Sequence, residues 1–263
     1  MHQESRVAGH YDVVVIGSGF GGSVAALRLS EKGYRVAVLE AGRAFESEDF
    51  ALTNWNLRRQ FWFPWVGCYG TWSMHLLREV LILHGVGVGG GSLLYANTLF
   101  VPPDTVWQDP QWRGLEDWGA VMPEHYRTAK QMLGATPCPK PGVADEALKR
   151  VAERRGLGHT YKKTDVSIYF GEPEVEVEDP YFGGEGPPRT GCTFCGSCMV
   201  GCPVGAKHTL DQNYLYLAEA RGVQIMPETE VTGVRPNSSG GYDVTTRGST
   251  GKKLLGKTFS AGG

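Results

Sequence analysis

The first forty residues contain apolar runs whose lengths match a strand, a helix and a second strand. Residues 11–16 form a short β-branched run, which predicts a fully buried strand. Over residues 23–32, Ala, Leu and Arg recur at helical spacing, and Gly33 marks the expected end of the helix. Residues 35–39 are again apolar and predict a second buried strand that closes at Glu40. The pattern therefore predicts a βαβ unit of about thirty residues.

The apolar pattern is less regular after this unit. Residues 43–78 are rich in Trp and Phe without a clear period, so we expect an irregular excursion. Residues 79–84 predict a strand that leads into the glycine-rich turn 85–92, and residues 93–99 then predict the first turns of a helix. Helices are predicted at 115–134, 143–155 and 210–221, a solvated acidic loop at 172–179, and strands at 161–170, 223–226, 230–234, 242–246 and from 257 onward.

Charge and composition exclude several classes of protein. The 26 basic and 28 acidic residues give a net charge of −2, which provides no basic footprint for nucleic acid or a membrane surface. The first nineteen residues have neither a basic start nor a long apolar stretch, and no segment approaches the ~18 apolar residues of a membrane span. We therefore predict a soluble, cytoplasmic protein with no nucleic-acid partner and no transmembrane segment.

Glycine is in excess, with 37 residues in a chain of 263, and part of the excess has a specific use. Gly17, Gly19 and Gly22 form G-x-G-x-x-G between the first predicted strand and the helix. The first glycine permits a tight turn, the second lets the backbone approach a pyrophosphate, and the third lets helix and strand pack closely. The helix N-terminus then attracts the phosphates.

A carboxylate and a second glycine loop narrow the choice of dinucleotide. Glu40 lies at the end of the second strand, where it can accept hydrogen bonds from a ribose diol and would repel a 2′-phosphate. This favours FAD or NAD over NADP. The second loop at 85–92 indicates a ligand held at both its pyrophosphate and a large ring system, which favours FAD.

Three stretches of the chain resemble a known family. DVVVIGSGFGGSVAALRLSEKGYRVAVLEAGR, GVGVGGGSLLYANTLF and GCPVGAKHTL, the last followed by a Tyr-Leu helix and ETEVTGV, are similar to GMC-type FAD-dependent oxidoreductases, and most similar to their cholesterol oxidase-like branch. The resemblance runs from Tyr11 to the last residue. It implies oxidation of an alcohol, with hydride passing from the carbinol carbon to flavin N5, and O₂ or another acceptor reoxidising the flavin.

The resemblance also implies site residues. The first loop would hold the pyrophosphate, Glu40 the adenosine ribose, and Val231 would contact the adenine. The second loop and the segment after it would lie against the pyrophosphate and flavin. The full set of implied cofactor-binding residues is Gly17, Ser18, Gly19, Phe20, Gly22, Glu40, Gly90, Gly91, Tyr95, Asn97 and Val231.

The sequence departs from the family pattern in two places. The steroid oxidases read GGGSLVNGGM where this chain reads GGGSLLYANT, so their flavin-contacting Asn falls on Tyr95, with Asn97 two places later. The chain also stops at FSAGG, whereas the family continues for roughly as long again and carries its catalytic His there. We therefore expect an N-terminal fragment that is inactive alone. None of the seven histidines, including His84 and His208, lies in a base motif, so the catalytic residues are unknown.

Four of the six cysteines fall within eleven residues. Cys192-x2-Cys195-x2-Cys198-x3-Cys202-Pro203 has the spacing of a ferredoxin-type [4Fe–4S] run and makes these four thiols candidate metal ligands. A single cluster would need Cys202 to fold back, or a fourth thiolate from Cys68 or Cys138. The alternatives are buried free thiols, or a disulfide formed on oxidation.

These observations together predict an α/β fold, α+β overall, in which a Rossmann-like FAD-binding domain is interleaved with part of a substrate domain and truncated at its C-terminus. The expected division is an FAD-binding βαβ unit at 11–42, the aromatic-rich excursion at 43–78, a second FAD-binding segment at 79–101, a partial substrate or lid region at 102–190, and a cysteine-rich return to the FAD domain at 191–263.

Three functions fit these features. The leading hypothesis is FAD-dependent oxidation of a small-molecule alcohol, such as a sterol or hydroxysteroid. The alternatives are a non-catalytic flavin-binding remnant, and an Fe–S electron carrier in which the Rossmann-like part is scaffold. The sequence does not predict the oligomeric state.

Overall fold

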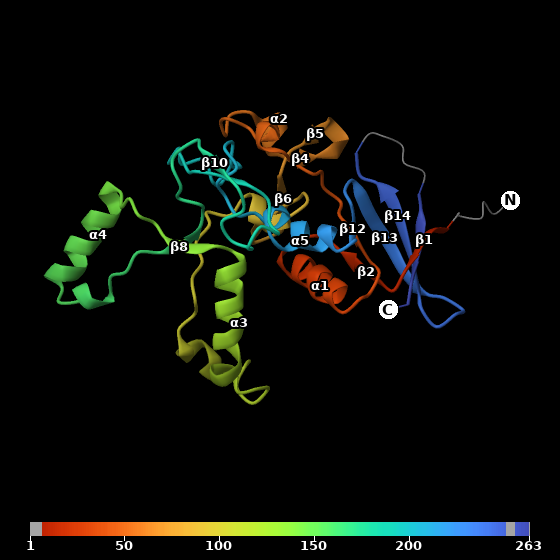
Figure 1. The fold of residues 1–263 in the computed structure, drawn as a ribbon, viewed down its shortest axis with the longest axis horizontal. Coiled ribbons are helices and arrows are strands. Elements are labelled where there is room, and N and C mark those ends of the chain that lie inside the picture. The colour runs from red at the N-terminus through yellow and green to blue at the C-terminus, as the bar shows by residue number, and fades with distance from the viewer. Residues whose placement is uncertain (1–6, 251–255, 263) are drawn as a thin grey trace.

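The computed structural model describes residues 7–250 and 256–262. At its centre lies a parallel sheet of β2 (Val13–Ile16), β3 (Val36–Leu39) and β12 (Gln224–Met226), in the order β12-β3-β2. Helix α1 (Phe20–Glu31) connects β2 to β3 and packs against α5 (Tyr214–Ala220) (Figure 1). The predicted βαβ unit is therefore confirmed, and β12 extends it from nearly two hundred residues away in the sequence.

The main core lies between this sheet and the two helices. It contains Ala26 and Leu27 of α1, Val36 and Val38 of β3, and Leu215 of α5. All four residues of β3 are buried, as predicted. The expectation of a fully buried first strand is wrong, because β2 is the edge strand of this sheet and Ile16 is 55% exposed.

A second, four-stranded sheet lies beside the first in the order β1-β15-β14-β13 (Figure 1). Its strands are β1 (Val7–Tyr11), β13 (Thr229–Pro236), β14 (Tyr242–Gly248) and β15 (Thr258–Ala261). β1 pairs with β15 in parallel, and the other pairs are antiparallel. Leu39, Val244 and Phe259 form a small core that joins the two sheets.

The excursion at 43–78, predicted to be irregular, ends in a regular strand, β6 (Trp72–Leu76), but contains only short elements before it. They are a 3₁₀ turn at Ser47–Asp49, α2 (Leu57–Gln60), β4 (Trp62–Phe63), a 3₁₀ turn at Pro64–Val66 and β5 (Cys68–Tyr69). A hairpin of β6 (Trp72–Leu76) and β7 (Leu81–Gly85) then leads into the second glycine loop.

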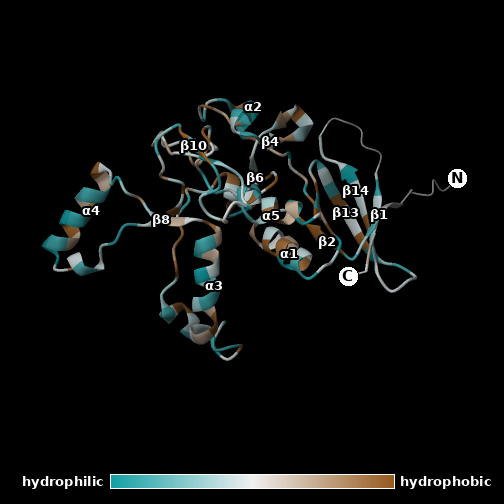
Figure 2. Cartoon of the chain, in the orientation of Figure 1, coloured by the Kyte–Doolittle hydropathy of each residue, from teal (hydrophilic) through white to brown (hydrophobic). Residues whose placement is uncertain are grey.

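Two helices project away from the sheets (Figure 1). They are α3 (Trp118–Met132) and α4 (Val143–Arg154), close to the predicted bounds and separated by the expected proline-rich break. Neither has a buried residue, and Figure 2 shows α4 as largely hydrophilic with hydrophobic patches. The remaining elements are β8 (Ala135–Pro137), β9 (Asp165–Ser167), β10 (Glu176–Val177), β11 (Arg189–Thr190) and 3₁₀ turns at Gly90–Leu93, Asp104–Gln108, Gly158–Thr160 and Leu210–Gln212.

Two local predictions are wrong. The expected helix at 93–99 does not form: a 3₁₀ turn ends at Leu93, and irregular chain follows it. The Lys207 ammonium donates hydrogen bonds to the Leu93 and Tyr95 carbonyls, which are therefore engaged outside a helix. The predicted strand at 161–170 is confined to β9, which pairs with β8. The acidic stretch contains the short strand β10, but most of it is exposed loop.

Candidate functional site

The first glycine loop leaves the N-terminus of α1 open. Gly17 has φ +88° and donates its N–H to the Leu39 carbonyl, which fixes the turn between β2 and α1. A Cβ on Gly22 would lie 1.9 Å from the Gly17 oxygen, whereas one on Gly19 would meet no atom within 4 Å. No side chain caps α1, and its first turn has no acidic residue. This is the arrangement that accepts an anion at a helix N-terminus.

The second glycine loop lies directly against the first. A Cβ on Gly90, which has φ +54°, would stand 2.8 Å from the Gly19 Cα. Gly91 lies beside the Phe20 ring, with 3.9 Å between the position of its Cβ and Phe20 Cε2. The structure therefore brings together two loops that lie about seventy residues apart in the sequence, as FAD binding at both would require.

Ser18 and Glu40 join the two loops. Ser18 donates its N–H and hydroxyl to Glu40 Oε2 at 3.0 and 2.7 Å, and its Oγ accepts the Gly89 N–H at 3.1 Å. The other Glu40 oxygen accepts the Gly42 N–H at 2.8 Å. Both side chains are buried. Glu40 thus holds the loop in shape, and its oxygens keep lone pairs with which to accept a ribose hydroxyl.

The segment after the second loop contains the predicted flavin-contacting residues. The Tyr95 ring packs edge-on against Phe20, with 5.8 Å between the ring centroids, and burial raises the pKa of Tyr95. Asn97 is completely buried and has φ 63°. Neither the nitrogen nor the oxygen of its side-chain amide has a hydrogen-bond partner. An unpaired buried amide is costly, so Asn97 is suited to a polar ligand such as a flavin.

Val231 lies on β13, apart from the glycine loops. It packs against the small core of Leu39, Val244 and Phe259 and pairs with Thr246 across the sheet. Leu39 is the residue that precedes Glu40, so Val231 lies near the end of β3 where the resemblance would place the adenosine.

Sequence reasoning missed Lys207. Its side chain is buried, and its ammonium donates to the carbonyls of Leu93, Tyr95 and Cys198 at 3.0, 3.0 and 2.8 Å. The ammonium also lies 4.9 Å from the centroid of the Tyr95 ring. Burial lowers the pKa of Lys207 to about 8. The sequence did contain a signal for this residue: Lys207 is the one charged residue in GCPVGAKHTL, a run of mostly small and apolar residues shortly before a buried helix.

Of the two histidines singled out from the sequence, one is buried and the other is exposed. His208 is fully buried and packs edge-on against Tyr181, with 4.1 Å between the ring centroids. Burial and the neighbouring Arg189 guanidinium lower the pKa of His208 to about 3, so its imidazole stays neutral. His84 lies on the exposed β6–β7 hairpin, where its Nε2 is 2.9 Å from Nε2 of His75.

The four clustered cysteines line one apolar pocket of about 250 Å³, together with Cys138. All six cysteines are free thiols. The Phe194 N–H donates to Cys192 Sγ at 3.3 Å. Burial opposes ionisation of Cys195, but hydrogen bonds from the Ser197 backbone and side chain outweigh it and lower the pKa of that thiol. Among the described residues, no three His, Cys, Asp or Glu side chains are arranged to hold a metal ion as they stand.

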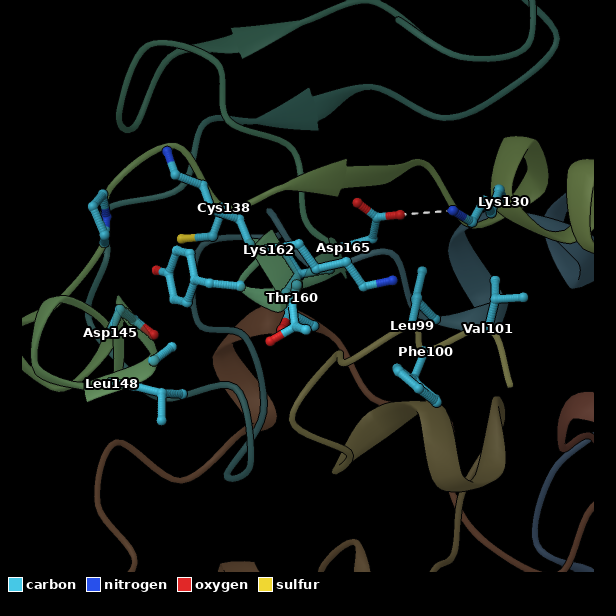
Figure 3. A pocket seen from close by; sticks show the side chains of 16 residues that line it. Leu99, Phe100, Val101, Lys130, Cys138, Asp145, Leu148, Thr160, Lys162 and Asp165 are labelled. Carbon is cyan, nitrogen blue, oxygen red and sulfur yellow. Dashed lines mark hydrogen bonds and ion pairs between the residues drawn. The ribbon is translucent and has the colours of Figure 1, made fainter. Parts of the chain in front are cut away.

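A larger cavity of about 500 Å³ lies between α3, α4 and β9 (Figure 3). Leu99, Phe100 and Val101, which follow the Tyr95–Asn97 segment, form part of its wall, and Leu148 of α4 faces it from the other side. Lys130 and Asp165 form an ion pair at its edge, with 2.7 Å between Nζ and Oδ2. Most of its lining lies in the segment 102–190, predicted as a partial substrate or lid region, whereas Leu99–Val101 end the segment predicted to bind FAD.

Comparison with known proteins agrees with this geometry. Residues 12–52 match the family model described as FAD binding domain. The chain is 54% identical to a cholesterol oxidase of Mycobacterium tuberculosis, over 90% of this chain and 42% of that protein. It is 50% identical to a cholesterol oxidase of Acinetobacter baumannii, over 90% of this chain and 44% of the relative. The chain thus spans less than half the length of these relatives.

A solved structure shares this fold. Pyridoxine 4-oxidase from Mesorbium loti superposes with a TM-score of 0.56 over 95% of this chain and 48% of that chain, at 16% sequence identity.

Residues 12–52 thus match an FAD-binding domain, and the chain has a mixed α/β fold. More particularly, it is homologous to cholesterol oxidases, which confirms the predicted resemblance to the cholesterol oxidase-like branch of the GMC-type FAD-dependent oxidoreductases. No described helix is long and apolar enough to cross a membrane.

Proposed function

We propose that the protein takes part in FAD-dependent oxidation of an alcohol with a large apolar body, a sterol or hydroxysteroid. The observation that carries the proposal is the contact between the two glycine loops around the open N-terminus of α1. The identity of 50–54% to cholesterol oxidases supports the substrate class. Six free thiols fit a reducing, cytoplasmic location.

The residues present fit FAD. The N–H groups at the start of α1 would bind the pyrophosphate, Glu40 the ribose, and Val231 would lie near the adenine. The uncapped helix, the free space at Gly19 and the unpaired Asn97 amide are the features that such a ligand satisfies. When bound, FAD accepts the hydride from the carbinol carbon.

The chain's own residues bind and orient in this proposal. The hydrogen bond between Ser18 and Glu40 holds the first glycine loop in place. Lys207 fixes the backbone that carries Tyr95 and Asn97. The wall at Leu99–Val101 supplies apolar surface for the body of the substrate. We assign no base among the described histidines, because His208 is buried and neutral and His84 lies on an exposed hairpin.

Substitution of Gly19 by alanine tests FAD binding at the loop. The new Cβ would meet no protein atom within 4 Å, so the fold should be kept, while the methyl group would occupy the space proposed for the pyrophosphate. We expect FAD affinity to fall about tenfold or more by fluorescence titration. Gly119→Ala, at the start of α3, is the matched control and should bind FAD like the unmodified protein. Equal affinity of both variants would contradict binding at this loop.

Substrate class is tested separately by bleaching of bound FAD under anaerobic conditions with cholesterol. Bleaching by cholesterol, and none by a short-chain alcohol, would support a sterol substrate. FAD binding without bleaching by any alcohol is the result expected if the chain binds FAD but is inactive alone.

A further inference from the structure

The cysteine run has no part in the proposed FAD site, but the fold arranges it around a common space. Cys192, Cys195, Cys198 and Cys202 all line the 250 Å³ pocket, which we call the cysteine pocket. Ile168 and Phe170 form part of its apolar wall. Ala96, which lies between Tyr95 and Asn97 in the sequence, also lines the pocket. Cys138 also lines it, whereas Cys68 lies on β5 and does not.

The backbone folds Cys202 back toward the other three cysteines. The N–H groups of Val200 and Gly201 both donate to the Ser197 carbonyl, at 2.8 and 3.2 Å, which closes a turn between Cys198 and Cys202. Gly201 has φ +125°, and a Cβ there would lie 2.1 Å from the Phe50 ring. Only glycine permits this turn, and the turn is what a single-cluster arrangement of the run requires.

The loop between the first two cysteines presents a backbone donor to sulfur. Phe194 has φ 58°, and its N–H points at Cys192 Sγ over 3.3 Å. Hydrogen bonds to cysteine sulfur stabilise thiolates and tune metal-bound clusters. Lys207 adds a buried positive charge next to the run, since its ammonium lies 2.8 Å from the Cys198 carbonyl. Such a charge favours a group of net negative charge held by four thiolates.

We propose that Cys192, Cys195, Cys198 and Cys202 bind a [4Fe–4S] cluster in the cysteine pocket. The spacing C-x2-C-x2-C-x3-C-P is that of ferredoxin-type runs, while zinc sites normally separate their two cysteine pairs by a longer segment. All four thiols line this pocket, and cluster binding would require their sulfurs to come closer together than they now stand. The assignment is independent of the alcohol substrate and of the FAD site.

The experiment is metal analysis of the protein prepared without oxygen. The protein is purified anaerobically, incubated with ferrous iron and sulfide, desalted, and assayed for iron, acid-labile sulfide, zinc and FAD. We expect iron and sulfide in equal amounts, about four of each per chain, and an electron paramagnetic resonance signal after reduction with dithionite. Iron-free protein, or zinc in stoichiometric amount without sulfide, would overturn the proposal.

Single serine substitutions define the ligand set. Cys192→Ser, Cys195→Ser, Cys198→Ser and Cys202→Ser should each lose at least half of the iron and sulfide, while the FAD content stays unchanged. Cys138→Ser, inside the pocket, and Cys68→Ser, outside it, are matched controls that should keep full iron. Loss of iron in Cys138→Ser with full iron in Cys202→Ser would refute the assignment of Cys202. An unchanged circular dichroism spectrum shows that each variant is folded, and the FAD content reports separately on the proposed function.

Discussion

At the scale of single residues, the ammonium of Lys207 links two parts of the chain that lie more than one hundred residues apart in the sequence. Its three acceptors are the Leu93 and Tyr95 carbonyls after the second glycine loop and the Cys198 carbonyl in the cysteine run. A buried lysine is stable only when its charge is paired or fully hydrogen-bonded. Here three backbone carbonyls supply the bonds, so one side chain holds together the FAD-binding segment and the cysteine pocket.

Replacement of Lys207 by methionine should therefore destabilise the protein. Methionine keeps most of the apolar stem but leaves three buried or part-buried carbonyls without the Lys207 donor, and we expect a loss of about 2–4 kcal/mol in the free energy of unfolding. Urea denaturation measures this loss. Lys149→Met, on the exposed surface of α4, is the control and should change the stability by less than about 0.5 kcal/mol. Similar stabilities of the two variants would show that the Lys207 bonds contribute little.

At the scale of elements, the loop between β10 and β11 is organised by one carboxylate. The Asp179 side chain accepts the N–H groups of Tyr181, Phe182, Gly184 and Gly186 at 2.9–3.0 Å. Burial opposes ionisation of Asp179, but these four donors outweigh it and hold its pKa below the usual value. The loop in turn places Tyr181 against His208, so an exposed segment supports a buried one.

The Asp179 carboxylate makes the stability of this loop dependent on pH. Because its pKa is lowered in the folded protein, the stabilisation is present above the unfolded value of 3.8 and is lost as the pH falls through the folded pKa. Asp179→Asn should lower the free energy of unfolding by about 1 kcal/mol at neutral pH and have little effect below the folded pKa. Denaturation at several pH values checks this, with the exposed Glu178→Gln as control. A loss that is the same at every pH would argue against the carboxylate.

At the scale of the whole molecule, the β6–β7 hairpin presents apolar side chains to solvent. Leu76 and Leu81 face each other across the hairpin and are 82% and 57% exposed. The other exposed apolar residues of this hairpin are Met74, Leu77, Val80, Ile82 and Leu83. Exposed apolar side chains gathered on one hairpin indicate a contact face with another copy of the chain.

The exposed hairpin predicts self-association of the chain. Double substitution Leu76→Thr and Leu81→Thr keeps strand-forming residues but removes much of the apolar surface, and we expect less concentration-dependent association in sedimentation velocity. Leu115→Thr is the control, because Leu115 is 70% exposed outside the hairpin. The expectation fails if the unmodified chain stays monomeric at every concentration, or if the double variant associates to the same extent.

The sequence predicted those parts of the structure that depend on neighbouring residues. The βαβ unit follows from apolar runs and from glycines at fixed spacing, and α3 and α4 follow from helical periodicity on either side of a proline-rich break. The positions of Gly17 and Gly22 in the first loop are equally local, because the turn between β2 and α1 requires them, and Glu40 directly follows β3 in the sequence.

Only the tertiary structure decided the features that depend on distant partners. The segment 93–99 has a helical pattern, yet Lys207, more than one hundred residues away, bonds to its carbonyls and keeps it irregular. Ser18 meets Gly89, and Cys202 reaches the cysteine pocket because Gly201 fits against Phe50. The periodicity of apolar residues shows which side of a helix or strand is apolar. Where a charge is buried, or where two backbone segments come into contact, depends instead on which segments meet in the folded chain.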